Sequence, residues 1–152
     1  MRILFLVFSG TYNTQRIARL LASDFVSNGH TFDIVNIDID TPLLKLEKYD
    51  LIGFGYPIYA FNEPRFFWRY IKKLSLPVSA KYFIFKTSGE TLALNNASSR
   101  RIIRKIRREK RSLIGDYHFV MPYNIHFRFD DAFVKEIIDY NRKLSKVLVY
   151  NV

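Results

Sequence analysis

The sequence predicts an α/β fold, a three-layer sandwich with helices on both faces of a five-stranded parallel sheet. Two observations and one general rule support this. Short apolar runs alternate with helical patterns along the 152 residues. The first run, residues 3–8, is continuously apolar, which is typical of a strand buried on both faces. Strands separated by helices pair in parallel through right-handed crossovers. No linker or repeat divides the chain, so we expect residues 1–152 to form a single domain.

An amphipathic helix is predicted after the first strand, over residues 13–29. Its apolar face carries Ile17, Leu20, Leu21 and Phe25. Asn28-Gly29 supplies a C-terminal stop, because glycine adopts the left-handed conformation without strain. Residues 31–39 alternate apolar and polar, which predicts the second strand, and residues 41–50 predict a loop or a short helix.

The remaining elements are predicted from the same two periodicities. The strands are residues 51–57, 81–89 and 116–124. The helices between them are residues 63–74, with proline in the first turn, and residues 98–113. Asp130 is predicted to cap a last helix. The inner face of that helix is expected to carry Phe133, Ile137, Tyr140 and Leu144.

Composition excludes several classes of function. The chain has no cysteine, which removes disulfides, thiolate metal sites and a cysteine nucleophile, and favours the reducing cytoplasm. No segment approaches the roughly 20 apolar residues of a membrane span. The three histidines are isolated, so we expect them to be structural. Asp38 and Asp40 are expected to cap the turn after the second strand.

The loop after the first strand is rich in hydroxyl groups and contains no charged residue. It reads Ser-Gly-Thr-Tyr-Asn-Thr, residues 9–14, and leads into a helix N-terminus whose free N–H groups and dipole attract anions. Such a loop suits a single phosphate monoester better than a polyphosphate with magnesium. The alternative is an ordinary helix cap, since Ser, Thr and Asn are the usual capping residues.

Two further loops should meet the first at the carboxyl edge of the sheet. Residues 56–62 crowd Tyr56, Tyr59 and Phe61 around a proline, and these rings either stack on a flat ligand or cover the end of the core. Residues 87–90 offer hydroxyls beside Gly89, whose backbone can approach a ring closely. A phosphate at one loop and a flat heteroaromatic between the others describes flavin mononucleotide (FMN).

Residues 8–14, FSGTYNT, are similar to the flavodoxin phosphate loop, S/T-x-T-G-N-T. The segments YDLIGFGYPIYAFNEP, KYFIFKTSGE, LNNASS and YHFVMPYNIHFRF together resemble the flavodoxin-like half of the flavodoxin–ferredoxin fusion proteins of anaerobic bacteria. The resemblance implies a flavodoxin-like sheet of strand order 2-1-3-4-5 and FMN as the cofactor. The FMN-binding residues that it implies are Ser9, Gly10, Thr11, Tyr12, Asn13, Thr14, Pro57, Ile58, Tyr59, Ala60, Phe61, Asn62, Thr87, Ser88, Gly89 and Glu90.

The sequence departs from that pattern in two places. Tyr12 stands where flavodoxins usually have glycine, so it is strained if the position needs a positive φ. Alternatively, its side chain turns outward and covers the phosphate. The fusion proteins also carry a cysteine-rich ferredoxin half, which this cysteine-free sequence of 152 residues does not contain.

The resemblance implies electron transfer by bound FMN, with no catalytic side chain. The alternatives are an FMN-dependent NAD(P)H:quinone or flavin reductase, and a flavodoxin fold that has lost FMN and acts as a basic interaction module. The net charge of +10 favours an acidic redox partner, such as a ferredoxin or a ferredoxin domain. It also predicts a less negative flavin potential than in flavodoxins, which are typically acidic. We expect a monomer or a weak dimer.

Residues 100–111 form the most basic part of the chain, with eight basic residues and one acid. The basic side chains predicted to cover one broad helical face are Arg100, Arg101, Arg104, Lys105, Arg107, Arg108 and Arg111. Most simply this is the solvated outer face of a core helix. It would also suit an acidic redox partner, while nucleic acid is less favoured because no recognised binding motif accompanies the charge.

Overall fold

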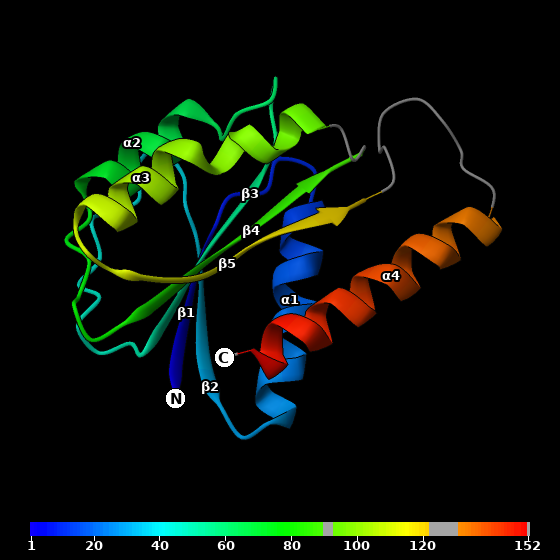
Figure 1. Ribbon diagram of the computed structural model, residues 1–152, viewed down its shortest axis with the longest axis horizontal. Coiled ribbons are helices and arrows are strands. Elements are labelled where there is room, and N and C mark those ends of the chain that lie inside the picture. The colour runs from blue at the N-terminus through cyan, green and yellow to red at the C-terminus, as the bar shows by residue number, and fades with distance from the viewer. Residues whose placement is uncertain (90–92, 122–130, 152) are drawn as a thin grey trace.

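The computed structural model describes residues 1–89, 93–121 and 131–151, and within them the strands form one parallel sheet (Figure 1). The strands are β1 (Arg2–Val7), β2 (Thr31–Asn36), β3 (Leu51–Pro57), β4 (Lys81–Ser88) and β5 (Ser112–Val120). Their order is β2-β1-β3-β4-β5, and every neighbouring pair is parallel. This confirms the fold class and the strand order that the sequence implied.

Helices cover both faces of the sheet (Figure 1). They are α1 (Asn13–Ser27), α2 (Arg65–Lys73), the 3₁₀ helix η1 (Ala93–Ser99), α3 (Arg100–Arg108) and α4 (Asp131–Tyr150). Helices α1 and α4 lie together on one face, and α2 and α3 lie together on the other. None of the helices in the described part of the chain is long and apolar enough to span a membrane.

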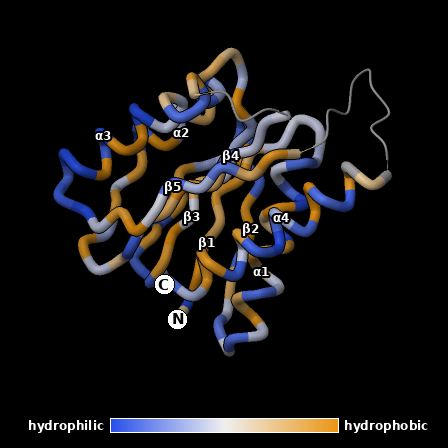
Figure 2. The backbone as a smooth tube through the Cα atoms, turned by 45° about the vertical axis from the view of Figure 1, so that its right-hand side comes forward, coloured by the Kyte–Doolittle hydropathy of each residue, from blue (hydrophilic) through white to orange (hydrophobic). Residues whose placement is uncertain are grey.

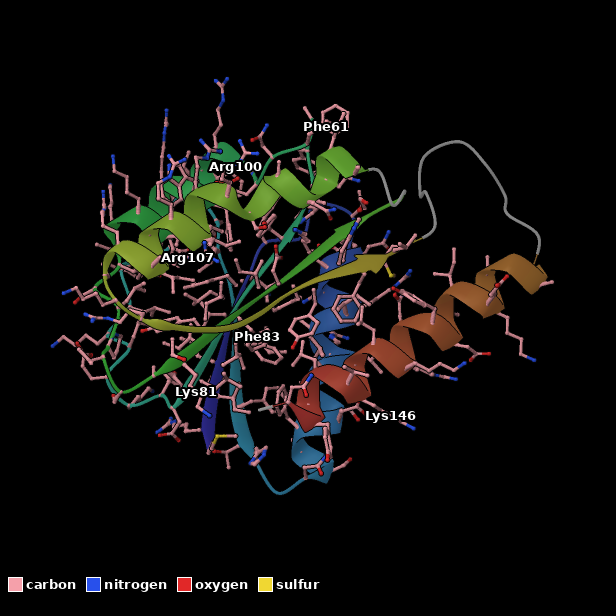
Figure 3. The ribbon with its side chains drawn as sticks, viewed as in Figure 1. Phe61, Lys81, Phe83, Arg100, Arg107 and Lys146 are labelled. Carbon is pink, nitrogen blue, oxygen red and sulfur yellow. The ribbon has the colours of Figure 1, made fainter. Side chains whose placement is uncertain are left out.

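Each face of the sheet has its own hydrophobic core, because successive strand residues point to opposite sides. Leu4, Ile52 and Ile84 lie in the core beneath α2 and α3. Phe5 and Phe83 lie in the core beneath α1 and α4, and Figure 3 shows Phe83 directed toward that layer. Figure 2 shows the central strands as largely hydrophobic, while the helices alternate between hydrophobic and hydrophilic residues. This alternation is the pattern from which the three layers were predicted.

The C-terminus of α1 ends as the sequence predicted. Gly29 has a φ of +78°. Its N–H donates to the carbonyl of Val26 at 2.9 Å, and the N–H of His30 donates to the carbonyl of Phe25 at 3.1 Å. These two bonds satisfy carbonyls that the helix end would otherwise leave free, which defines a Schellman motif.

Several predicted boundaries move for local reasons. Strand β2 ends at Asn36, three residues early, because Asp38 caps a turn by accepting bonds from the Asp40 N–H (3.0 Å) and the Thr41 hydroxyl (2.7 Å). That capping role was expected. Residues 41–50 are irregular, so the loop is confirmed and the short helix is not. Strand β5 begins four residues earlier than predicted, at Ser112, and the predicted strand residues 122–124 lie outside the described residues.

The predicted basic helix 98–113 is shorter and less uniformly exposed than expected. It starts as a 3₁₀ helix and α3 ends at Arg108. Two predictions of outward-facing charge were wrong. Lys105 is buried, with its amine donating to the Leu74 carbonyl at 3.0 Å. Arg111 lies beyond α3, and its Nε donates to the Leu76 carbonyl at 2.7 Å.

The inner face of α4 is more polar than predicted. Ile137 is buried as expected, but Tyr140 is 53% exposed, so its predicted inward position was wrong. Asn141 and Ser145 are buried instead, because each is hydrogen-bonded: the Asn141 amide donates to the Val120 carbonyl at 2.8 Å, and the Ser145 hydroxyl donates to Asp24 at 2.5 Å. The predicted cap at residue 130 and the side chain of residue 133 lie outside the described part.

Candidate functional site

Thr87 joins the three loops that the sequence singled out. Its hydroxyl hydrogen-bonds to the hydroxyl of Thr14 at 2.8 Å, and both side chains are buried. Its carbonyl accepts a bond from the N–H of Ile58 at 2.8 Å. The end of β4 is therefore bonded both to the start of α1 and to the segment after β3, and the loops meet at the carboxyl edge of the sheet.

The first loop, residues 9–14, forms an uncharged entry to α1. The hydroxyl of Ser9 accepts a bond from the Gln15 N–H at 3.3 Å. Helix α1 has no acidic residue in its first turn, so no side-chain carboxylate there neutralises the partial positive charge of the helix N-terminus. This leaves an environment that favours a bound anion.

Tyr12 has both the positive φ and the outward-turned side chain that the sequence raised as alternatives. Its φ is +64°, in the left-handed region, which costs about 1–2 kcal/mol for a residue with a side chain. The side chain is 69% exposed and so turns outward from the loop. The strain and the outward position occur together.

The second loop contains a strained two-residue turn. Tyr59 and Asn62 exchange backbone bonds, 2.8 Å from the Tyr59 N–H and 3.0 Å from the Asn62 N–H. The central residues, Ala60 and Phe61, have φ values of +47° and +63°. Positive φ at both central positions is the pattern of a type I′ turn, which normally takes Asn-Gly. Phe61 is 45% exposed at the tip (Figure 3), and strain of this kind clusters at functional sites.

Tyr59 belongs to the first loop as much as to the second. A Cβ atom on Gly10 would overlap the Tyr59 hydroxyl, so only glycine lets that hydroxyl lie over the loop backbone. The Tyr59 ring meets the Phe8 ring edge-on, with centroids 6.2 Å apart. The two aromatic residues of the turn therefore lie in different places. The Tyr59 hydroxyl lies at the first loop, and the Phe61 ring projects from the turn. Tyr56, the third aromatic residue of this segment, is fully buried and covers the core.

The third loop is held by a histidine that the sequence gave no reason to place there. The Ser88 hydroxyl hydrogen-bonds to Nε2 of His118 at 2.7 Å and accepts a bond from the Asn95 amide at 3.2 Å. Burial lowers the pKa of His118, and the positive charge of Lys86 lowers it further. The imidazole is therefore held in its neutral form beside Ser88. The predicted site residue Glu90 lies outside the described residues.

A buried lysine that pairs with Asp116 on the edge strand β5 lies one residue before the third loop. The amine of Lys86 is 2.9 Å from Asp116 and 3.0 Å from the Ser99 hydroxyl, and Ser99 also donates to Asp116. Lys86 is 2% exposed. Burial, followed by the charge of Asp116, raises the pKa of Tyr56 well above its ordinary value. A lysine inside an apolar strand was the one sequence signal for this cluster.

A second ion pair fixes the turn against α3. The carboxylate of Glu63, directly after the turn, is buried and accepts a bond from Nε of Arg101 at 2.7 Å. The Arg101 guanidinium also lies over the ring of Trp68 on α2, 5.5 Å from its centroid. Arg101 is thus a structural residue and not part of a free basic surface.

Metal chemistry has no support within the described ranges. Among the residues that the structure places, no group of three or more His, Cys, Asp or Glu side chains could hold a metal ion. The chemistry of this edge is that of hydroxyls, backbone N–H groups and aromatic rings.

Comparison with sequences gives little. No protein-family model matches the chain. An uncharacterized protein of Methanocaldococcus jannaschii is 38% identical over 77 residues, which is 51% of this chain and 47% of that protein. The matched part thus spans about half of that relative.

Comparison with solved structures is more informative. A short-chain flavodoxin associated with a PDU bacterial microcompartment superimposes with a TM-score of 0.70 at 12% identity, covering 99% of this chain and 97% of the other. Flavodoxin 1 from Bacillus cereus gives 0.67 at 15%, covering 96% and 98%. The NAD(P)H:quinone oxidoreductase from Methanothermobacter marburgensis gives 0.68 at 10%, covering 97% and 96%. The chain has a flavodoxin-like fold.

Proposed function

We propose that the protein binds FMN at the three joined loops and transfers electrons between redox partners. The observation that carries the proposal is the pair of hydrogen bonds made by Thr87, one to Thr14 and one to Ile58. These bonds hold an anion-favouring loop and an exposed aromatic turn at one edge of the sheet. The flavodoxin-like fold supports it, because ligands of doubly wound sheets bind beyond the carboxyl ends of the strands.

The first loop fits the phosphate of FMN. It has no acidic side chain, it leads into the N-terminus of α1, and the Tyr59 hydroxyl lies over the backbone of Gly10. That hydroxyl adds a donor to a cradle of N–H and hydroxyl groups. No lysine or arginine is present in the loop, which agrees with a single phosphate and not with a polyphosphate.

The second and third loops fit the flavin ring. Phe61 projects from the turn and offers a face on which a flat ring can stack. Ser88, fixed by neutral His118, holds the backbone that leads to Gly89 in place on the other side. The side chains position the ring and exclude water from it, while FMN itself, when bound, supplies the redox chemistry. The proposal needs no catalytic side chain.

The test compares FMN with riboflavin, which lacks the phosphate. Fluorescence titration of the purified chain should show tighter binding of FMN, with quenching of its emission. Tyr59→Phe should weaken FMN about 10- to 100-fold, the effect of one hydrogen bond to a charged group, and leave riboflavin unchanged. Equal affinity for the two flavins would contradict the phosphate loop, and binding of neither would contradict the proposal.

A quinone or flavin reductase of the same fold is the second candidate. One solved structure of similar fold is an NAD(P)H:quinone oxidoreductase, and the turn that carries half-exposed Phe61 lies at the surface, where a substrate could reach a ring bound beside it. Steady-state NAD(P)H oxidation with a quinone acceptor separates the two functions. Turnover would assign the reductase, and stoichiometric reduction without turnover would assign the carrier.

A further inference from the structure

The charge of the molecule is concentrated in one helical layer. Helices α2 and α3 together carry ten lysine and arginine residues and no acidic residue. Helices α1 and α4 carry six basic and four acidic residues over a greater length. The ten positive charges of α2 and α3 therefore equal the net charge of the whole chain, which is +10.

Some of that charge is used inside the molecule. Arg101 neutralises buried Glu63 at 2.7 Å. Lys105 is buried, pairs with Glu109 at 2.5 Å and donates to a backbone carbonyl at 3.0 Å. Replacing either residue would disturb the fold, so neither belongs to an interaction surface.

Four arginines of α3 remain, and they form what we call the arginine ridge: Arg100, Arg104, Arg107 and Arg108. All four are exposed, and none forms an ion pair with a residue that the structure describes. They line an open groove of about 820 Å³ whose apolar part includes Ala93, Ala97 and Ile103. A second hollow of about 200 Å³, lined by Lys72, Arg104 and Arg108 among others, extends the positive surface toward α2.

The ridge begins at the edge of the candidate site. Arg100 precedes Arg101, whose bond to Glu63 fixes the start of α3 beside the aromatic turn. Figure 3 shows Arg100 and Phe61 toward the same end of the molecule, with Arg107 farther along α3. At 1.5 Å per residue, the ridge runs about 12 Å from that edge. A partner seated on it would lie against the exposed turn.

We propose that the arginine ridge docks an acidic redox protein, with carboxylates of the partner pairing with the four guanidinium groups and an apolar contact reaching Ile103. Guanidinium groups bind carboxylates in a bidentate manner, and a concentrated positive patch steers an acidic partner during encounter. The redox character of the partner rests on the proposed flavin function, whereas the docking surface rests on the charges alone.

The geometry favours a protein over nucleic acid or a membrane. At about 12 Å the ridge is too short to follow a long phosphate backbone. A helix that lies in a membrane surface needs an exposed apolar face. In α3 that face is used by the core, because Ile102 and Ile106 are fully buried.

The experiment measures the affinity of the full chain for a purified small acidic ferredoxin, with and without FMN, over a range of salt concentrations. The ridge variant is Arg100→Glu/Arg104→Glu/Arg107→Glu. The control variant, Lys135→Glu/Lys143→Glu/Lys146→Glu, reverses three exposed charges on α4 and changes the net charge equally. We expect the ridge variant to bind at least about 10-fold more weakly and with a shallower salt dependence, and the control to change less than about 3-fold.

Each remaining outcome has a definite meaning. Equal weakening by the two variants, or no binding by the wild type, would overturn the docking surface. Selective loss of binding to a DNA duplex or to phosphatidylserine vesicles, with ferredoxin affinity unaffected, would also overturn it. If ridge-dependent binding persists in a chain that binds no FMN, the surface stands and the proposed flavin function fails. Thermal unfolding of both variants should match the wild type, because the replaced side chains are exposed.

Discussion

The two helical layers of this molecule are built differently, inside as well as outside. Beneath α1 and α4 the core is a cluster of phenylalanines: the ring centroid of Phe5 lies 6.1 Å from Phe25, 5.7 Å from Phe83 and 5.5 Å from Phe85. Beneath α2 and α3 the apolar core also encloses the amine of Lys86, which pairs with Asp116 on the edge strand β5. The layer with the strongly basic exterior is thus also the layer with buried charge.

Because of this difference, substitutions in the two layers should destabilise the protein by different mechanisms. An apolar core loses stability in proportion to the contacts removed, and a second substitution in it does not restore the stability lost by the first. A buried ion pair is costly to break but inexpensive to replace as a whole, because one partner left alone is an uncompensated charge. Stability measurements on substituted proteins can therefore test whether the two layers differ in this way.

The largest effect is expected at Asp116. Asp116→Ala leaves buried Lys86 without its counter-charge, so the free energy of unfolding should fall by about 3–5 kcal/mol in urea titrations. The double variant Lys86→Met/Asp116→Leu should recover most of that loss. A double variant as unstable as the single one would show that the pair is not the cause.

The next effect concerns the pair that links α3 to the turn. Arg101→Met leaves the carboxylate of Glu63 buried without a cation, and we expect a loss of about 2–4 kcal/mol in unfolding free energy. Arg104→Met, on the exposed arginine ridge, should change it by less than about 0.5 kcal/mol. Similar losses in both variants would mean that the contrast between structural and free arginines is wrong.

A smaller loss is expected at the joint of the three loops. Thr87→Val keeps the shape but leaves the Thr14 hydroxyl buried without this partner, so we expect about 1–3 kcal/mol of destabilisation and weaker FMN binding. Thr14→Val/Thr87→Val should be nearly as stable as the wild type. A double-mutant cycle with no coupling energy would show that the bond between the two hydroxyls does not stabilise the site.

The turn that leads into α2 should respond in the opposite direction. Ala60→Asn suits the positive φ and should raise the unfolding free energy by about 0.5–1 kcal/mol with FMN affinity unchanged. Phe61→Gly also suits the backbone but removes the ring, and it should weaken FMN about 5-fold, since aromatic contacts contribute of the order of 1 kcal/mol. If Phe61→Gly binds FMN as tightly as the wild type, the ring does not stack.

The smallest effect is a pH dependence from His118. Its pKa is lowered in the folded protein, so below the unfolded-state value of about 6.5 the unfolded chain binds more protons. The stability of the wild type relative to His118→Gln should therefore be constant above that pH and decline as the pH falls toward the folded-state pKa. A difference that does not vary across this window would show that the imidazole is not held neutral beside Ser88.

Sequence reasoning reached the fold because hydrophobic period and turn chemistry are local signals. The apolar run 3–8 and the Asn28-Gly29 stop each predict their structure from neighbouring residues alone. The same kind of reasoning was wrong for Lys105 and Tyr140. Residue type predicted the direction of each side chain, whereas carbonyls and partners brought in by other elements decided it.

The candidate site was predictable as a set of loops but not as a set of contacts. The positions of the first and second loops followed from strand ends. That Tyr59 reaches the first loop, that Thr87 bonds to Thr14, and that His118 holds Ser88 depend on distances between segments far apart in the chain. A single sequence carries no signal for such pairings, except where an unusual residue indicates that a partner must be present. Lys86 in an apolar strand is such a residue.

The bond between Thr14 and Thr87 spans 73 positions of the chain. Closing so long a loop is slow compared with forming a helix turn, so we expect this hydrogen bond to form late, once β1, β3 and β4 have paired. A ligand gripped by all three loops then has no site on the unfolded chain. At a concentration 100 times its dissociation constant it would add about 2.7 kcal/mol to the folded state. Ligand uptake would thereby report when the centre of the sheet has assembled.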